Sequence, residues 1–210
     1  MLRDTLVGLL EARLNRTDLN ASILAEMLLV QSVHLEGQGT FTPWFLESEM
    51  SSASTVIDEE RVPLPLDFLC AIEDEPLWLY DTTATPVWAK LGKTSVGLLT
   101  ERYTAPGRPL RYAVTDDYLV LAPVPNAVFS LKMRYYMRDV EPTTNIENKW
   151  LKYAPDLMLA VLGEIMARQY LQNQKLAEGF ATDVIAARSR LYIQHEARQH
   201  AGRVYQMGED

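Results

Sequence analysis

The chain has 210 residues, 48% of them hydrophobic, with 20 basic and 28 acidic side chains and a net charge of −8. This length favours one domain, or one domain with an added lobe, and the hydrophobic fraction is ordinary for a globular protein with a real core. The acidic balance argues against tight nucleic-acid binding, and no apolar run reaches the ~18 residues of a membrane span, so we expect a soluble protein made in the cytoplasm, without a membrane partner.

The N-terminal part of the chain predicts two helices. Leucines recur at helical spacing over residues 2–14, with charged residues elsewhere on the wheel. Thr17 or Asp18 is a candidate cap for a second helix, which we expect to end within residues 31–34. Residues 1–36 therefore predict a helical hairpin.

Hydrophobic periodicity is weak in the segment that follows. Gly37 to Asp58 predicts a loop or an extended arm, and Val56–Val62 predicts a short strand. Trp44 lies in an aromatic stretch of this segment. It either fills the core or contacts another subunit, because aromatic residues are enriched at interfaces.

The middle of the chain predicts β-structure. Leu110–Thr115 and Tyr118–Ala122 flank Asp116 and Asp117, which is a hairpin signal. Apolar and polar residues alternate in Val128–Tyr135, giving one face for a core and one for water. We expect these three segments to form an antiparallel β-meander. Further expectations are a strand at Leu77–Tyr80, a helical turn or strand at Asp67–Glu73, mixed structure at Pro86–Leu91 and a helix at Thr94–Tyr103.

The C-terminal part predicts helices. Pro155 suits a first helical turn, where its missing N–H costs nothing. Trp150, shortly before it, either caps the helix or packs between subunits. The expected order is a helix over Asp156–Gln172, with an ion pair between Glu164 and Arg168, a break over Gln172–Gly179, a second helix over Ala181–Gln199, and a flexible tail.

Together these elements predict an α+β fold. The N- and C-terminal helices form a bundle, and a central antiparallel β-sheet is inserted between them. The expected parts are an N-terminal helical hairpin (1–36), a β-rich insertion with an extended loop (37–148), C-terminal helices (149–200) and a flexible tail (201–210). The two helical parts are expected to form one domain.

The sequence contains no motif that indicates catalysis, a cofactor or a metal ion. It has neither a glycine-rich phosphate-binding loop nor a Gly-x-Ser-x-Gly nucleophile turn. His195 and His200 lie five residues apart, whereas two helical histidines need a spacing of four to reach one metal ion. We therefore expect two surface histidines. Cys70, among apolar neighbours, is expected in the core.

Charged clusters in the sequence have ordinary interpretations. The acidic runs Asp58–Glu60 and Glu73–Glu75 are expected to be solvated rather than catalytic. Arg111, Arg134 and Arg138 lie near tyrosines, an arrangement that can stack on nucleic-acid bases. Because the surrounding charge is balanced, surface ion pairs are the simpler interpretation.

Several weak motifs occur in a fixed order along the chain. They are Val62–Leu69, Leu110–Tyr112, Tyr118–Pro125, Leu131–Tyr136 and Asn148–Asp156. Their order and spacing resemble the head–tail adaptor (connector) proteins of tailed bacteriophages, over about residues 1 to 195. The match departs from the family at the Asp116-Asp117 turn, where glycine is more typical, and in the segment Gly37–Glu60.

This resemblance implies a structural protein of the virion neck without catalysis. Such adaptors assemble, usually as twelve copies, into a ring beneath the capsid portal. The ring joins the portal to tail or nozzle proteins and encloses a channel through which DNA passes without sequence-specific binding. The polar segment His195–Asp210 is the expected portal-docking element. The candidate contact residues are Trp44, Trp150, Tyr153, His195, Arg198, His200, Arg203 and Tyr205.

Two other classes of function stay open. One is a small cytoplasmic α+β enzyme with an acidic site, which a carboxylate of strongly shifted pKa in a deep pocket would favour. The other is a free interaction module that binds partners without forming a ring.

Overall fold

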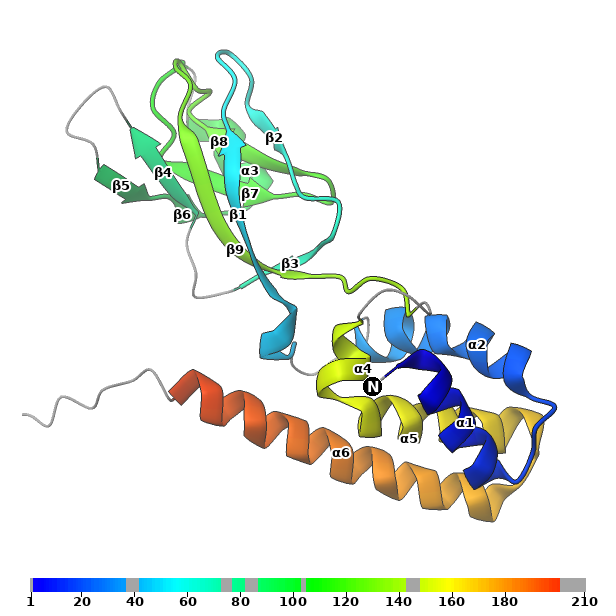
Figure 1. Ribbon diagram of the computed structural model, residues 1–210. Helices are drawn as coiled ribbons and strands as arrows, with labels where there is room; N and C mark the ends of the chain where they lie inside the picture. Colours follow the sequence, from blue (N-terminus) through cyan, green and yellow to red (C-terminus); the bar gives the residue numbers. More distant parts are fainter. Residues whose placement is uncertain are drawn as a thin grey trace, which may run out of the picture. The chain divides into compact units, whose positions relative to one another are not determined.

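The computed structural model describes residues 2–36, 42–72, 77–81, 87–102, 105–142 and 148–200. The chain forms two compact units: a helical unit of residues 1–46 and 138–210, and a sheet unit of residues 47–137. The predicted α+β class is confirmed, because helices occupy both ends of the chain and the strands between them pair mainly antiparallel (Figure 1). Within the described ranges, no helix has the length and apolar character to cross a membrane.

The helical unit combines segments from both ends of the chain. Its α-helices are α1 (Arg3–Leu14), α2 (Asn20–Leu29), α4 (Lys149–Tyr153), α5 (Pro155–Ile165) and α6 (Gln174–His200). Two π-helical segments, η1 (Val30–Leu35) and η3 (Met166–Tyr170), extend α2 and α5. A short 3-10 helix, η2, covers Trp44–Leu46. The helices predicted near both termini are therefore present.

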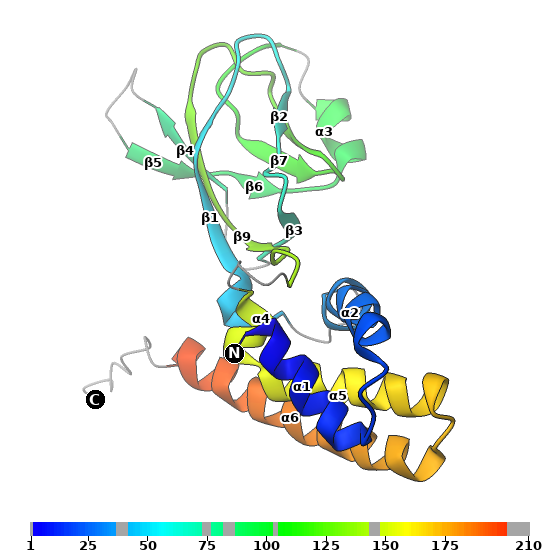
Figure 2. The same cartoon turned by 45° about the vertical axis from the view of Figure 1, so that its right-hand side comes forward.

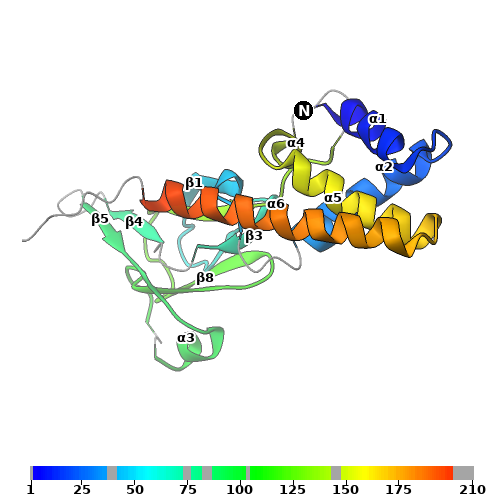
Figure 3. The ribbon, with the colours of Figure 1, turned by 90° about the horizontal axis from the view of Figure 1, so that it is seen from below.

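Helix α5 lies at the centre of this unit. Every residue from Leu157 to Gly163 is buried, because α5 packs against α1, α2 and α6. Figure 3 shows α5 and α6 running side by side. A Cβ atom placed on Gly163 would lie 2.3 Å from the ring of Phe180 in α6. Glycine at this position therefore allows the close approach of the two helices.

The predicted cap of α2 was wrong. Leu19 is the N-cap residue and makes no side-chain cap bond. The carboxylate of Asp18 instead accepts a hydrogen bond from Arg16 Nε at 2.6 Å. Because the Asp18 carboxylate is engaged in this ion pair, it does not cap the helix. Burial of Ile23 and Met27 stabilises α2 without a side-chain cap.

Helix α6 begins earlier than the predicted Ala181. Asn173 Oδ1 accepts a hydrogen bond from the N–H of Leu176 at 3.1 Å, which caps the helix at its first turn. The break between helices is therefore confined to residues 171–173. The predicted i,i+4 ion pair between Glu164 and Arg168 is present at 2.7 Å.

The described residues of the sheet unit form two sheets and one helix (Figure 2). The first sheet has the order β1 (Glu47–Ser54), β9 (Ser130–Met137), β4 (Trp78–Asp81) and β5 (Val87–Lys90), and β3 (Phe68–Ala71) also pairs with β9. The second has the order β2 (Arg61–Pro63), β8 (Tyr118–Ala122), β7 (Arg111–Val114) and β6 (Gly92–Lys93). The predicted helix, α3 (Val96–Arg102), packs Leu99 against the second sheet.

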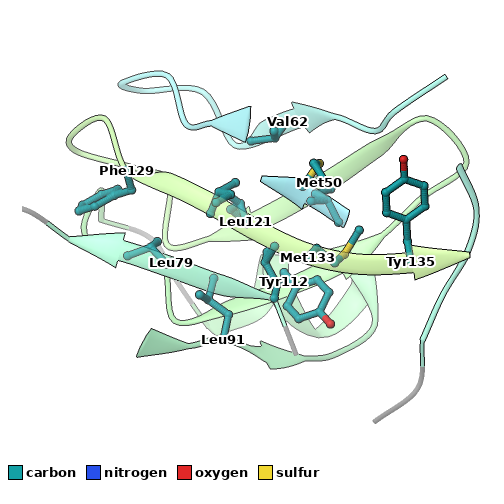
Figure 4. Close-up of a cluster of buried hydrophobic side chains, with 12 residues drawn as sticks. Met50, Val62, Leu79, Leu91, Tyr112, Leu121, Phe129, Met133 and Tyr135 are labelled. Carbon is teal, nitrogen blue, oxygen red and sulfur yellow. The ribbon is translucent and has the colours of Figure 1, made fainter. Parts of the chain in front are cut away.

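The core of the sheet unit lies between the two sheets (Figure 4). Strand β9 has the predicted alternation, with Leu131, Met133 and Tyr135 buried. Ser130 and Arg134, on the opposite face, are exposed, and Lys132 on that face is partly exposed. The buried members of this core are Met50, Val62, Leu77, Leu79, Leu91, Tyr112, Leu119, Leu121, Phe129, Leu131, Met133 and Tyr135.

Residues 37–41 lie outside the described part of the chain, and the prediction of a loop or arm at Gly37–Asp58 was wrong for residues 47–54, which form β1. Of these residues only Met50 is buried, so the strand has no hydrophobic alternation of its own. Its partner β9 holds it: Glu49 pairs with Lys132 at 3.0 Å, and Glu47 pairs with Arg134. The strand predicted at Val56–Val62 is confined to β2, Arg61–Pro63.

Two further predictions in this unit were wrong. The hairpin of β7 and β8 is present, but β9 leaves it for the other sheet, so the three strands are not a meander. Pro123 and Pro125 lie between β8 and β9, and neither has an N–H to continue the ladder. Cys70 is exposed rather than buried, and it lies in β3, a strand of four residues that pairs with β9 off the main path of the first sheet.

Candidate subunit interface

Four aromatic side chains of η2 and α4 form one cluster in the helical unit: Trp44, Phe45, Trp150 and Tyr153. The rings of Phe45 and Tyr153 stack with centroids 5.3 Å apart and planes 20° apart. Phe45 also meets the Trp150 ring edge-on at 5.1 Å. Trp44 lies 5.2 Å from Phe45 and 6.1 Å from Tyr153. Stacked and edge-on contacts of this kind stabilise aromatic cores and interfaces.

Two cations lie against this aromatic cluster. The guanidinium carbon of Arg198, in the last turns of α6, is 4.5 Å from the Trp44 ring centroid. Lys152 Nζ is 5.4 Å from the ring centroid of Tyr153. Both are cation–π contacts. Because Tyr153 is 41% exposed and Trp44 is half-buried, the cluster presents aromatic and cationic groups at the surface, as protein interfaces do.

Trp150 anchors the cluster from inside. Its side chain is only 1% exposed, and its indole Nε1 donates to Oε1 of Glu36 at 3.1 Å. The same oxygen accepts from the N–H of Asp139 at 3.2 Å and from Gln31 Nε2 at 3.3 Å. Burial raises the pKa of the Glu36 carboxyl, although these donors oppose the shift.

A second carboxylate fixes the start of α4. Asp139 Oδ2 accepts from the backbone N–H groups of Lys149 at 2.5 Å and Trp150 at 3.1 Å. Asn148 caps the helix, because its Oδ1 accepts from the N–H of Leu151 at 2.9 Å. Burial also raises the pKa of the Asp139 carboxyl. These bonds set the position from which α4 presents its aromatic residues.

Helix α6 carries apolar residues on two of its sides. Phe180, Ala187 and Leu191 face the helical unit and are buried. Ile185, Tyr192 and Ile193 are 68%, 49% and 65% exposed. At about 100° per residue these three lie within about one third of the helix circumference, away from the buried side. We call them the outer stripe of α6.

A second exposed apolar patch lies on α2 and η1. Leu28, Leu29 and Val33 are 40%, 53% and 43% exposed. Isolated exposed apolar residues are common on soluble proteins. Here two groups of three occur on different helices, so the helical unit has two distinct apolar surfaces in addition to its aromatic cluster.

The structure brings together four of the eight residues predicted for contacts with partners. Trp44, Trp150, Tyr153 and Arg198 all belong to the aromatic cluster or contact it. Of these, Trp150 is buried within its own unit and supports the surface rather than forming it. His200 is the last residue of α6, and its side chain, like Arg203 and Tyr205, lies outside the described part of the chain.

The prediction that His195 is a surface residue was wrong. Its side chain is 6% exposed, because it continues the buried side of α6 one turn after Leu191. The four-residue spacing of Ala187, Leu191 and His195 was the signal for this burial. Among the described residues no three His, Cys, Asp or Glu side chains are grouped as metal ligands would be.

Sequence reasoning did not identify Phe45 or the outer stripe of α6. Phe45 stands between Trp44 and Leu46 in an aromatic stretch, but only the fold places it against Trp150. The outer stripe had a sequence signal, because Ile185 and Tyr192 are seven residues apart, which is two helical turns.

A family model described as "SU10 adaptor protein" matches residues 4–206, which is nearly the whole chain and includes both units. No curated protein matches the sequence.

Proposed function

The chain belongs to the SU10 adaptor protein family, and from this premise we propose that it is a head-to-tail adaptor of the phage virion. In this proposal it is a structural protein of the neck. Copies form a ring beneath the portal, join the portal to tail or nozzle proteins and enclose the channel for DNA. Synthesis in the host cytoplasm and a ring of twelve copies are part of the same proposal.

The two apolar surfaces of the helical unit support ring formation and carry this proposal. A closed ring needs a heterologous contact, in which two different surfaces of each copy meet. The outer stripe of α6 and the patch formed by Leu28, Leu29 and Val33 are two such surfaces, on different helices. We assign them to opposite sides of the contact between neighbouring helical units.

The C-terminal segment His195–Asp210 is the proposed portal-docking element. The aromatic cluster lies beside the last turns of α6, because Arg198 contacts Trp44. Residues 201–210 follow directly and include Arg203 and Tyr205. An aromatic, cationic surface beside the last described turn of α6 is suited to binding a large partner, and Tyr153 and Trp44 extend the contact.

The charge of the chain suits a channel through which DNA slides. The net charge is −8, and a ring of acidic copies repels phosphate instead of binding it. Arg134, one candidate for stacking on bases, is paired with Glu47, as expected for surface ion pairs. We therefore propose passage of DNA without sequence-specific binding.

The enzyme alternative required a shifted carboxylate in a deep pocket. The carboxyls of Glu36 and Asp139 have raised pKa values, but their oxygens accept hydrogen bonds from Trp150 Nε1 and from backbone N–H groups. These bonds hold α4 in place. Burial within the helical unit raises both pKa values, and both carboxylates are engaged in holding α4, so the shifts do not favour an enzyme.

Truncation after His200 tests the docking element. Because Arg198 contacts Trp44, this boundary keeps α6 and the aromatic cluster complete. We expect the truncated protein to unfold at the same temperature as the full chain and to lose binding to the cognate portal, measured by co-sedimentation. Binding equal to that of the full chain would contradict the assignment.

A further inference from the structure

The outer side of the first sheet carries tryptophans and cations together. Trp78 in β4 is the register partner of both Lys90 in β5 and Lys132 in β9. Lys90 Nζ lies 5.0 Å from the Trp78 ring centroid, and the rings of Tyr80 and Trp88 are 5.0 Å apart. Trp88 is 40% exposed. We call this surface the aromatic–cationic face.

A hollow lies in this face. It has a volume of about 360 Å³ and is lined by Glu49, Trp78, Trp88, Lys132 and Arg134. Lys132 is paired with Glu49, and Arg134 with Glu47 of the same strand. These ion pairs hold the floor of the hollow in place, whereas the tryptophans form apolar walls with Lys90 beside them. Large aromatic walls with a nearby cation fit an apolar protein segment that also carries carboxylates.

The sheet unit itself contains a segment of that chemistry. The turn between β1 and β2 exposes Val56 and Ile57 by 52% and 51%. Asp58, Glu59 and Glu60 follow, and all three are exposed. We call residues 56–60 the apolar–acidic turn. It lies at the tip of the sheet unit, where the cyan ribbon passes from β1 to β2 (Figure 2).

Two backbone hydrogen bonds hold the apolar–acidic turn. The N–H of Asp58 donates to the carbonyl of Pro125 at 2.9 Å, and the N–H of Glu59 donates to the carbonyl of Val56 at 3.2 Å. The turn is therefore preorganised, which lowers the entropy cost of docking it into a partner. It leads into β2, at the edge of the second sheet, whereas the aromatic–cationic face belongs to the first.

We propose that the apolar–acidic turn of one copy docks in the aromatic–cationic face of the next copy in the ring. Val56 and Ile57 enter the hollow between Trp78 and Trp88, and Glu59 pairs with Lys90. The two surfaces are complementary in charge and in apolar character. Each copy carries one of each, on different sheets, which is what a head-to-tail contact requires. This inference rests on the proposed ring and adds a second contact to it, between sheet units.

A charge-swap experiment tests this pairing in the full chain. Lys90→Glu and Glu59→Lys each place like charges at the contact, so each is expected to raise the protein concentration needed for half-maximal ring formation on the portal by about tenfold. The double variant restores an opposite-charge pair and is expected to assemble within about twofold of the wild type. Lys93→Glu is the matched control, because Lys93 is an exposed lysine of the second sheet.

The readout is the number of copies per portal, measured by native mass spectrometry over a range of concentrations. Both exchanged residues are exposed, and thermal unfolding verifies that each variant is folded. The inference would be overturned if the single variants formed rings at the same concentration as the wild type. It would also be overturned if the double variant needed as high a concentration as the single variants. In both cases the wild-type protein still forms rings, so the proposed function would stand. A wild-type protein that forms no ring on the portal would instead overturn the proposed function, and this contact with it.

Discussion

The indole Nε1 of Trp150 and Oε1 of Glu36 form a hydrogen bond of 3.1 Å across 114 residues of sequence. Glu36 follows the N-terminal helices, and Trp150 lies in the first turn of α4, the first of the C-terminal helices. This bond therefore ties both ends of the chain into one helical unit. It also places the aromatic cluster, because Trp150 packs against Phe45.

Replacement of Trp150 tests this link. Trp150→Phe removes the donor and some volume, so we expect the free energy of unfolding to fall by about 1–3 kcal/mol. Trp150→Ala also empties the buried site and should cost about 3–5 kcal/mol. Urea denaturation measures both changes. Trp88→Phe, at an exposed site, is the control and should change stability by less than about 0.5 kcal/mol.

The raised pKa of Glu36 predicts a pH dependence of stability. A carboxyl whose pKa is higher in the folded state binds its proton more tightly there than in the unfolded state. The stability it contributes is therefore complete below its ordinary pKa of 4.5 and is lost as the pH rises through the raised value. We expect the free energy of unfolding to decrease from about pH 4.5 towards neutral pH.

Glu36→Gln isolates this effect, because glutamine keeps an acceptor oxygen for Trp150 but carries no charge. The variant should lose less stability than the wild type between pH 4.5 and pH 7. Asp139 shifts in the same direction and keeps part of the dependence. Denaturation at several pH values gives the comparison. Parallel curves for the two proteins would show that Glu36 is not the group responsible.

Two glycines give opposite predictions for the packing of α5 on α6. Gly163→Ala drives a methyl group into the Phe180 ring and should destabilise the protein by about 1–3 kcal/mol. A Cβ on Gly179 meets nothing within 4 Å, so Gly179→Ala should stabilise α6 by about 0.5–1 kcal/mol. The pair Gly163→Ala with Phe180→Leu should regain part of the loss. Thermal unfolding of the three variants shows whether contact with Phe180 or helix propensity determines the effect of each glycine. If helix propensity alone mattered, both glycine-to-alanine changes would raise stability.

The outer stripe of α6 predicts assembly defects without loss of fold. Ile185→Asp or Ile193→Asp removes an exposed apolar side chain and adds a charge to the proposed contact, so ring formation on the portal should weaken at least about tenfold. Gln194→Asp, an exposed neighbour, is the control for the added charge. Circular dichroism should be unchanged in all three. Rings formed equally well by both isoleucine variants would remove α6 from the contact.

The sequence predicted those helices and strands whose own residues carry a hydrophobic pattern. Strand β9 alternates buried and exposed residues, and the run Leu157–Gly163 is apolar, so each segment carries its own signal. Strand β1 does not, because its residues are mostly polar and its conformation depends on ion pairs to β9. The transfer of β9 to the other sheet likewise depends on tertiary packing, which no short pattern encodes.

The same distinction holds for the candidate interface. Trp44 and Trp150 were predictable as candidate aromatic anchors, since aromatic residues are enriched at interfaces. Their meeting through Phe45, and the position of Arg198 over Trp44, required the fold. His195 was predicted at the surface, although its four-residue spacing from Leu191 was a signal for the burial that the structure shows.

Electron microscopy of the protein mixed with its cognate portal tests the central claim most directly. We expect a second ring stacked on the portal ring and absent from portal alone, with the helical units of neighbouring copies in contact through the outer stripe of α6. The images would also give the number of copies, for which the family resemblance leads us to expect twelve. Portal rings left bare, with the protein remaining separate, would contradict the assignment of this chain as a portal-bound ring adaptor.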